Sequence, residues 1–507
     1  MSRRSIVIAT WGNPFEWGKA YYRLTESENK VESVTSLYLI MEKLSPNLTV
    51  VLVPETLICV DAIKRYGGEV LSLRLGGKDE YSRLISGLGK SIEEFFKKNM
   101  PGKGGIKVVV APNVGEYGYE GVRFKWGLPV GGRVSPDSAY ASYVLISTIL
   151  GLMEVSKRTE EVSIYLDTTH GINFMPLAAY RAVMAASRIT SAFYRLKIEF
   201  EQYNSTPYPR GIRREELGEL PELEVFSVKK EIITPVKAVQ RLVYSYLSRE
   251  DVKPIRFAKS LNKEEISEIK EKLKFLEKMQ EIHGKARSVA SSTHYSMPLA
   301  FLQFSKEAEI DIEEMENLIR KMEKHMDELL SYIDVKKEER KLSIEHLVTQ
   351  SYEDLKSLLS AFSIISYGGN CVKLLENNIK INEGLVESRL NTLERTVEYL
   401  QGPLAEVAEN EISNFREKPS PEGLRKMIET AKKRRGIWIS PRENGFQCED
   451  VKRIMIAHAG LAFRSIEVMF DGSEIWLRYR RDCLKRTREI IKGALEDTRK
   501  MVAGEEW

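Results

Sequence analysis

Residues 164–176 read Ile-Tyr-Leu-Asp-Thr-Thr-His-Gly-Ile-Asn-Phe-Met-Pro. The apolar, β-branched run 162–166 has the composition of a buried strand, and residues 175–187 are typical of the helix that follows it, with Pro176 in the first turn. In an open α/β sheet the loop between them lies at the carboxyl end of a strand, where backbone N–H groups and a helix N-terminus together favour anions. The stretch therefore predicts a binding site for a phosphate-bearing ligand.

Polar residues at three strand ends are the candidates for ligand contact. The 164–176 loop offers Thr168, Thr169, His170, Gly171 and Asn173, and two other predicted strand ends offer Trp11, Gly12, Asn13 and Asn113. Carboxyl ends of parallel strands meet at one sheet edge, so these residues are expected to converge on one pocket. A purely structural role is the alternative, in which Thr168, Thr169 and Asn173 cap the helix and Asp167 holds the turn.

Short β-branched runs alternate with helical segments over the first 220 or so residues. This spacing predicts an α/β region with a largely parallel, Rossmann-like sheet. No Gly-x-Gly-x-x-Gly follows the first strand and no Gly-Lys-Ser/Thr loop is present, which disfavours NAD and ATP as ligands. The predicted strands are 5–10, 48–53, 70–75, 106–111, 162–166, 192–203 and 222–228.

Length and composition indicate a cytoplasmic protein of two or three domains. The chain has 507 residues, 42% of them hydrophobic. Its longest apolar stretch, 140–153, falls short of the roughly 20 residues that span a bilayer and predicts a buried helix. The apolar N-terminal run is too short for a signal peptide. No Cys-x-x-Cys pair occurs among Cys59, Cys371, Cys448 and Cys483, so free thiols are expected, without a zinc site or disulfide framework.

The character of the sequence changes after residue 235. Residues 238–417 carry apolar positions at helical spacing and almost no strand signal, which predicts packed helices at 263–282, 310–332, 344–365 and 385–415. The histidines here form no His-x-x-x-His pair, so no metal site is expected. Residues 418–423 are typical of a linker, and a last helical block is predicted over 424–502, with a short hairpin around 443–446.

Arg453 and His458 are the candidate catalytic residues. They lie five positions apart, about 140° around an ideal helix, so a second protomer could complete the site. Arginine clamps a phosphate by charge-assisted hydrogen bonds, and histidine titrates near neutral pH, which suits RNA cleavage with the substrate's own 2′-OH as nucleophile and no metal. In the alternative, Arg453 pairs with Glu449 or Asp450 and His458 stabilises a helix C-terminus.

Basic residues are concentrated near this motif. Residues 421–507 hold 19 Lys and Arg against 14 Asp and Glu. Two basic runs, 432–435 and 478–488, lie near Trp438, Trp476 and Tyr479, a combination that suits the backbone and bases of single strands. Solvated helix faces are the alternative.

The motifs Asp-Thr-Thr-His-Gly-x-Asn-Phe-Met-Pro and Arg-x4-His-Ala-Gly, together with Thr-Trp-Gly-Asn-Pro at 10–14, resemble the CRISPR-associated type III ribonucleases that join a CARF domain to a HEPN domain. The resemblance implies a CARF domain at 1–230, a helical linker and insertion at 231–420, and HEPN helices at 421–507, with the HEPN bundle completed by helices of the middle region. It also implies a homodimer or higher oligomer that binds a cyclic oligoadenylate, most simply cyclic tetra-adenylate, and then cleaves single-stranded RNA.

By the same resemblance, Arg453 and His458 would form a composite site across the dimer. The cyclic ligand would contact Trp11, Gly12, Asn13, Thr168, Thr169, His170, Gly171 and Asn173. Family members commonly carry a polar residue directly after the arginine, whereas this chain has Ile454. Two other functions remain open from the sequence. One is a ligand-responsive transcription regulator with a helix-turn-helix at 236–261, and the other is a ring nuclease that degrades the cyclic ligand. Catalysis is expected to need no cofactor, and no membrane contact is expected.

Overall fold

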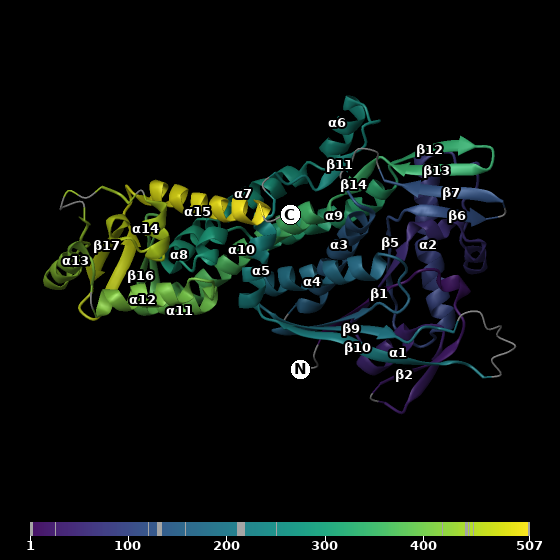
Figure 1. The fold of residues 1–507 in the computed structure, drawn as a ribbon, viewed down its shortest axis with the longest axis horizontal. Helices are drawn as coiled ribbons and strands as arrows, with labels where there is room; N and C mark the ends of the chain where they lie inside the picture. The colour runs from purple at the N-terminus through teal and green to yellow at the C-terminus, as the bar shows by residue number, and fades with distance from the viewer. Residues whose placement is uncertain are drawn as a thin grey trace.

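The computed structural model describes residues 4–504 except 26, 120, 129–133, 158, 210–218, 250, 418, 442–444, 446 and 450. An eight-stranded sheet forms the core of the N-terminal region (Figure 1). Its strands are β1 (Arg4–Thr10), β2 (Ala20–Leu24), β3 (Lys30–Ser33), β4 (Leu48–Pro54), β5 (Lys107–Ala111), β8 (Glu161–Asp167), β9 (Lys197–Ser205) and β10 (Glu222–Ile233). The order is β3-β2-β10-β9-β8-β1-β4-β5, and β9, β8, β1, β4 and β5 run parallel. The predicted α/β region with a parallel sheet is confirmed.

Helices of the N-terminal region are α1 (Ser36–Leu44), α2 (Lys78–Asn99), α3 (Pro136–Ser156) and α4 (Met175–Tyr194). Short 3-10 helices are η1 (Pro14–Glu16), η2 (Glu55–Cys59) and η3 (Asp61–Tyr66). Helices α3 and α4 pack on each other and on β1, and α3 is buried on nearly all sides. The predicted buried helix at 140–153 is thereby confirmed.

Two predicted strands are corrected. Residues 70–75 form turns, because the neighbouring Gly67 and Gly77 take positive φ angles and Leu71 donates its N–H to the carbonyl of Ile58 at 2.8 Å. Leu71 and Leu75 are buried and anchor this loop to the core. Their spacing resembles the alternation of buried side chains in a strand. The predicted strand 192–203 begins late, because α4 continues to Tyr194 and ends on Arg195 in the left-handed conformation.

The middle region contains strands as well as helices, so the prediction of an almost strand-free segment is wrong. Its helices are α5 (Pro235–Leu247), α6 (Lys263–Lys272), α7 (Phe275–His294), α8 (Pro298–Glu307), α9 (Ile312–Leu330), α10 (Tyr352–Leu375), α11 (Leu390–Leu400) and α12 (Ala405–Arg416). Its strands are β11 (Ile255–Phe257), β12 (Ile333–Glu338), β13 (Lys341–His346), β14 (Val348–Gln350), β15 (Ile379–Asn382) and β16 (Leu385–Arg389), and a 3-10 helix η5 (Glu376–Asn378) precedes β15.

Long-range pairing explains these missed strands. β13 runs parallel to β7 (Val122–Gly127), which pairs with β6 (Gly115–Tyr119), so a hairpin of the middle region completes a sheet begun in the N-terminal region. The β15–β16 turn uses Glu383 and Gly384, both with positive φ, as a two-residue hairpin favours. Segments 344–365 and 385–415 thus begin as strands and only then become helical.

The helix-turn-helix considered for 236–261 is not formed. In the described part of this segment α5 is followed by β11, and β11 pairs with β14. The apolar side of α5 packs against α10 and α4 instead of presenting a recognition helix.

Helix α10 lies at the centre of the molecule and connects the two ends (Figure 1). It packs on α4 and α5 on one side and on α7 and α8 on another. Ser363 and Ser366 donate their hydroxyls to the carbonyls of Ile189 and Phe193 on α4, at 3.0 and 2.7 Å. Helices α3 and α10 are both long and apolar enough to cross a membrane, but 89% and 83% of their most apolar windows are buried inside the protein, as in core helices.

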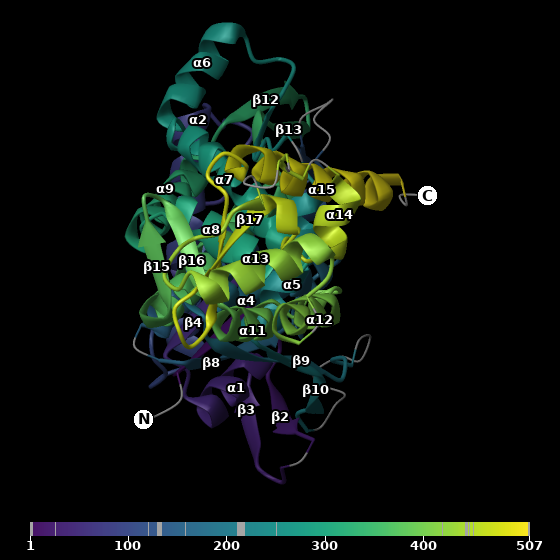
Figure 2. The same ribbon diagram turned by 90° about the vertical axis from the view of Figure 1, so that its left-hand side faces the viewer.

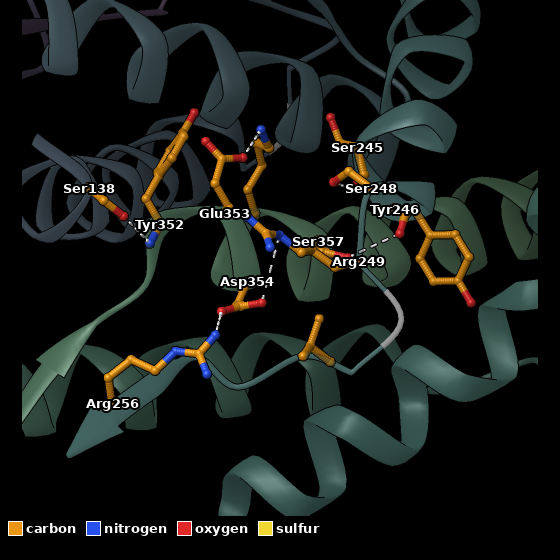
Figure 3. A network of polar contacts seen from close by, with 12 residues as sticks. Ser138, Ser245, Tyr246, Ser248, Arg249, Arg256, Tyr352, Glu353, Asp354 and Ser357 are labelled. Atoms are coloured by element: carbon orange, nitrogen blue, oxygen red, sulfur yellow. Dashed lines mark hydrogen bonds and ion pairs between the residues drawn. The ribbon is translucent and has the colours of Figure 1, made fainter. Parts of the chain in front are cut away.

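A polar network anchors the N-terminal end of α10 (Figure 3). The Asp354 carboxylate, 1% exposed, binds the Arg256 guanidinium at 2.8 Å and lies 4.0 Å from Arg249. The backbone N–H of Tyr352 donates to the Ser138 hydroxyl of α3 at 3.0 Å. Residues from α3, β11, α10 and the segment that follows α5 therefore meet at this point.

The C-terminal part contains α13 (Glu422–Lys433), α14 (Lys452–Ala457), the 3-10 helix η7 (Phe463–Ser465), β17 (Ile466–Phe470), β18 (Ile475–Tyr479) and α15 (Leu484–Gly504). These elements face the viewer in Figure 2. Strands β15, β16, β18 and β17 form one sheet, and α15 packs along α7. The hairpin predicted around 443–446 falls largely outside the described residues; the hairpin of this part is β17–β18.

Two cysteines are paired, which corrects the expectation of four free thiols. Cys448 and Cys483 form a disulfide, while Cys59 and Cys371 are free and buried. The bond joins the segment before α14 to the residue before α15. Sequence reasoning missed it because the two cysteines are 35 positions apart and meet only through the tertiary fold.

Candidate functional site

A pocket of about 770 Å³ opens at the carboxyl edge of the N-terminal sheet. Three of the predicted ligand residues, Thr169, His170 and Gly171, line it. The end of β9 contributes Asn204 and the polar loop after it contributes Tyr208, both of which sequence reasoning missed. That loop follows a strand end, so the rule applied to β8 could have found it. The other lining residues are Glu16, Trp17, Gly18, Tyr22, Val34, Ile172, Ser205, Thr206, Pro207 and Leu223.

Asp167 holds the turn at the end of β8. Its buried carboxylate accepts hydrogen bonds from the Ser36 hydroxyl at 2.7 Å and from the backbone N–H of Thr169 at 3.0 Å. Burial raises the pKa of this carboxyl, although both hydrogen bonds oppose the shift. Asp167 therefore holds the turn, which is the structural role considered for it. Its hydrogen bond to Ser36 also connects the pocket loop to the start of α1.

His170 forms one wall of the pocket as a neutral ring. It stacks on Trp17 with centroids 4.0 Å apart, and its Nε2 lies 3.4 Å from both the Tyr22 hydroxyl and the backbone N–H of Ser36. Burial lowers its pKa to about 3. A ring that stays neutral offers stacking and hydrogen bonding but no proton transfer near pH 7.

The two threonines of the loop differ in their bonding. Thr168 donates its hydroxyl to the carbonyl of Tyr203 at 2.9 Å and is buried against β9. Thr169 lines the pocket, and its buried hydroxyl forms no hydrogen bond of good geometry. This hydroxyl lies close enough to the Asp167 carboxylate to help lower the pKa of that group. An unsatisfied hydroxyl at a pocket wall is a ready partner for a ligand.

Helix capping does not account for this loop. The N-terminus of α4 has no side-chain cap, so Thr168, Thr169 and Asn173 do not fill the capping role. Asn173 is exposed and takes a left-handed conformation, with φ of 50°. Gly171 has no room for a side chain, because a Cβ there would lie 2.6 Å from Pro176 and from Thr10.

The remaining predicted ligand residues do not line the pocket. Trp11 is fully buried and meets Trp17 edge to face at 5.2 Å, so it supports the stacked ring. Gly12 packs against Ile172, and Asn13 caps η1. Asn113 is buried and donates to the hydroxyl of Tyr117 at 3.3 Å.

The second candidate site lies at the end of α14. His458 is the C-cap residue of this helix, and its Nδ1 lies 3.0 Å from the Glu411 carboxylate of α12. The hydrogen bond to Glu411 raises the pKa of His458, outweighing the opposite effect of partial burial. His458 is 39% exposed and lines a pocket of about 220 Å³ together with Glu411, Phe415, Ser420, Pro421, Leu424, Glu449, Ile454, Leu461, Ala462, Phe463 and Arg464.

Glu411 was missed from the sequence. It lies 47 residues before His458 within an amphipathic helix rich in glutamates, so no local signal distinguishes it from the other acids of α12. Its effect is to fix the orientation of the imidazole and leave Nε2 for chemistry.

Arg453 is exposed and does not line this pocket. Within the described part of the chain it forms no hydrogen bond or ion pair, and Glu449 instead accepts the backbone N–H of Val451 at 3.0 Å. The other acid considered, Asp450, lies outside the described residues. In one chain, the structure therefore does not bring Arg453 into the pocket that His458 lines.

Only part of the predicted basic and aromatic surface is exposed. Trp476 and Tyr479 are buried and cannot stack on bases in this conformation. Trp438 is partly buried, with Arg478 lying 4.2 Å over its ring. Most arginines of the 478–488 run bind acids, as in the pairs Arg478–Glu387, Arg480–Asp482, Arg481–Glu383 and Arg488–Glu307.

Comparisons with known proteins agree with this layout. A family model described as CRISPR system endoribonuclease Csx1, CARF domain, matches residues 6–207, and one described as CRISPR system endoribonuclease Csx1, HEPN domain, matches residues 402–481. A CRISPR system endoribonuclease Csx1 from Methanocaldococcus jannaschii is 24% identical over 421 residues, which cover 81% of this chain and 75% of the relative. The first match contains the loop 167–173, and the second contains Glu411, Arg453 and His458.

Proposed function

Because the chain belongs to the CRISPR-associated endoribonucleases that join a CARF domain to a HEPN domain, we propose that it cleaves single-stranded RNA at Arg453 and His458 without a metal ion. Cleavage is switched on when the N-terminal pocket binds a cyclic oligoadenylate, most simply cyclic tetra-adenylate. The observation that carries the proposal is His458, held by Glu411 in a pocket and five residues from an exposed arginine. RNA cleavage assays in EDTA, with and without the ligand, test it.

The chemistry follows from the two side chains. The 2′-OH of one nucleotide attacks the adjacent phosphorus, a new O–P bond forms, and the bond to the 5′-oxygen of the next nucleotide breaks. Nε2 of His458 takes the proton from the 2′-OH or gives one to the leaving oxygen. Arg453 binds the phosphate and stabilises the charge that develops on it. The products carry a 2′,3′-cyclic phosphate and a 5′-hydroxyl.

Two copies of the chain would complete this site. Arg453 does not line the pocket of His458 in the same chain, whereas a two-fold partner can bring its own pair opposite the first. Val451, beside the motif, is 45% exposed and gives this helix an apolar surface for such a partner. At the other end, Leu177 in the first turn of α4, the helix that follows the ligand loop, is 65% exposed. We therefore propose a homodimer in which both sites are shared.

The N-terminal pocket suits an oligoadenylate because rings and phosphate donors lie together. Trp17, Tyr22 and Tyr208 offer faces or edges to adenine, and the uncapped N-terminus of α4 lies after the loop. The CARF domain is proposed to span 1–230 with a Rossmann-like sheet, followed by a helical linker and insertion at 231–420 and HEPN helices at 421–507. The protein would act in the cytoplasm.

Coupling between the sites would pass through α10. Helix α4 begins at the ligand loop and is bound to α10 through Ser363 and Ser366. Helix α10 packs on α7, and α7 holds α15 through the Ser291 hydroxyl and the carbonyl of Ile491 at 2.6 Å. A ligand that prefers one arrangement of these helices shifts the population toward it by the difference in its affinities.

The competing functions have weaker support. A transcription regulator lacks the helix-turn-helix that was expected at 236–261. A ring nuclease that only positions the 2′-OH needs no titrating base, and burial, which lowers the pKa of His170 to about 3, makes this histidine a weak one. Incubation with labelled cyclic tetra-adenylate and a search for linear di-adenylate distinguishes this activity from activation alone.

Replacing Thr169 with Ala is expected to weaken ligand binding about tenfold and to change stability little, because its hydroxyl forms no hydrogen bond of good geometry and only lies near the Asp167 carboxylate. Calorimetric titration with cyclic tetra-adenylate measures the affinity, and thermal unfolding measures the stability. The matched variant Thr168→Ala loses the bond to Tyr203 and is expected to lower stability by about 1 kcal/mol. Unchanged affinity in Thr169→Ala would remove this hydroxyl from the site.

Replacing Glu411 with Gln is expected to move the pH–rate profile to lower pH. The hydrogen bond to Glu411 raises the pKa of His458, so its loss brings the pKa back toward the ordinary value of about 6.5. The same pair stabilises the fold below about pH 6.5, and this contribution disappears as pH rises through the raised pKa. Cleavage rates measured from pH 5 to 9 check the shift; a profile that does not move contradicts the role of Glu411.

A further inference from the structure

The exposed face of α13 carries a run of cations at its C-terminal end. Lys432, Lys433, Arg434 and Arg435, here called the α13 basic run, are all exposed. Across the part of the chain that the structure describes, none of the four side chains forms an ion pair with an acid. The 478–488 run differs, since most of its arginines are held by carboxylates. Among the described residues, all four cations of the α13 basic run are therefore exposed without an acidic partner, whereas most arginines of the 478–488 run are paired.

The opposite end of α13 lies at the pocket of His458. Pro421 and Leu424, at the start of the helix, line that pocket. Leu424 and Lys433 are nine residues apart, which corresponds to about 14 Å along a helix. Arg425 is also exposed between these ends. The same exposed face also carries Glu422, Lys426 and Glu429, and Lys426 pairs with Glu422 at 2.9 Å, so the excess of positive charge lies in the α13 basic run. The helix between the pocket and this run is long enough for several phosphates at the roughly 3.4 Å spacing of a stacked strand.

The pocket itself has room and partners for one nucleotide. Phe463 and Arg464 line it beside His458, with the guanidinium 5.9 Å from the Phe463 ring. An aromatic ring with an adjacent cation suits a base and its phosphate. At about 220 Å³ the pocket is below the roughly 300 Å³ at which drug-sized ligand sites begin, so the rest of a bound strand must lie outside it.

We propose that single-stranded RNA docks along the exposed face of α13, with one nucleotide in the pocket of His458, Phe463 and Arg464 and the adjoining phosphates on the α13 basic run. The proposal rests on the proposed RNA cleavage at the same pocket. It assigns affinity for long substrates to the basic run and local positioning to the pocket, because phosphate contacts act additively along a strand and carry no base preference.

Binding of a fluorescent, uncleavable 2′-O-methyl RNA 20-mer to the full-length protein with cyclic tetra-adenylate tests this surface. The test variant replaces all four residues of the α13 basic run with Gln. A matched variant replaces Lys336, Lys337, Arg340 and Lys341 with Gln, which removes the same charge from the β12–β13 hairpin at the other end of the molecule (Figures 1 and 2). Anisotropy titrations over a range of salt concentrations give affinity and salt slope.

The α13 variant is expected to bind the 20-mer at least tenfold more weakly and to lose about 3 from the salt slope, at about 0.7 per phosphate contact. A 2′-O-methyl tetramer should lose far less affinity, and the β12–β13 variant should bind like the wild type. Equal affinities of the α13 variant and the wild type for the 20-mer overturn the proposal, as does an equal loss in the β12–β13 variant. If the dimer of the α13 variant dissociates on ultracentrifugation while its RNA affinity equals that of the wild type, the surface binds a second copy of the chain. That result also overturns the proposal.

This binding assay is independent of chemistry. A wild-type protein that binds the 20-mer along α13 but leaves unmodified RNA intact contradicts the proposed function and not the docking surface. A wild-type protein that cleaves RNA while the α13 variant binds normally contradicts only the docking surface.

Discussion

The His458→Ala protein is expected to cleave activated RNA substrate 10²- to 10⁴-fold more slowly than the wild type, the range typical of losing a general acid–base group. The physical reason is the geometry at α14, where Glu411 orients Nδ1 and leaves Nε2 as the titrating atom in the pocket. Initial rates on a fluorescent single-stranded RNA, with saturating cyclic tetra-adenylate, measure the effect.

The matched control is His325→Ala. His325 is a half-buried histidine of α9 that stacks on Phe275, far along the chain from the motif. Its replacement should leave the rate within a factor of two. Equal rates for the wild type and the His458 variant would show that the catalytic group lies elsewhere.

The second large effect is expected at Asp354. Its replacement by Ala removes the buried carboxylate that binds Arg256 and faces Arg249 (Figure 3). Removing one member of a buried ion pair costs about 3 kcal/mol, near the lower limit of the usual range because Arg256 is itself partly exposed. Chemical denaturation measures the loss of stability. We also expect weaker activation by the ligand, since the network anchors the end of α10 that packs beside α4.

Glu353 is the neighbouring control. Its carboxylate binds Arg181 at 2.8 Å, but both side chains are partly exposed, so Glu353→Ala should cost less than about 1 kcal/mol. Similar losses in the two variants would contradict the claim that burial sets the importance of Asp354.

Local patterns were sufficient to predict the buried parallel strands of the N-terminal sheet, but they missed β2 and β3. Continuous β-branched runs at 5–10, 48–53 and 162–166 became β1, β4 and β8, because parallel strands covered on both faces are apolar throughout. The same patterns failed where pairing is long-range. β13 is stabilised by β7, more than 200 residues earlier, and nothing in the sequence of 341–346 identifies that partner.

The candidate sites show the same division. The strand–loop–helix rule identified Thr169, His170 and Gly171 at the pocket, but it could not distinguish them from Trp11 and Asn113, which are buried and do not line it. Motif spacing identified Arg453 and His458. Glu411 and the Cys448–Cys483 disulfide depend on contacts between distant helices and loops, which a local motif does not encode.

The central claim is that a ligand at the CARF domain controls a metal-independent ribonuclease at His458, and one titration tests it most directly. Cyclic tetra-adenylate is titrated into the wild type and the His458→Ala variant in EDTA, and both RNA cleavage and ligand binding are measured. We predict saturable, ligand-dependent cleavage by the wild type, with 2′,3′-cyclic phosphate ends, and equal ligand affinity without cleavage in the variant. Wild-type cleavage that does not depend on the ligand, or cleavage that persists in the variant, would contradict the account.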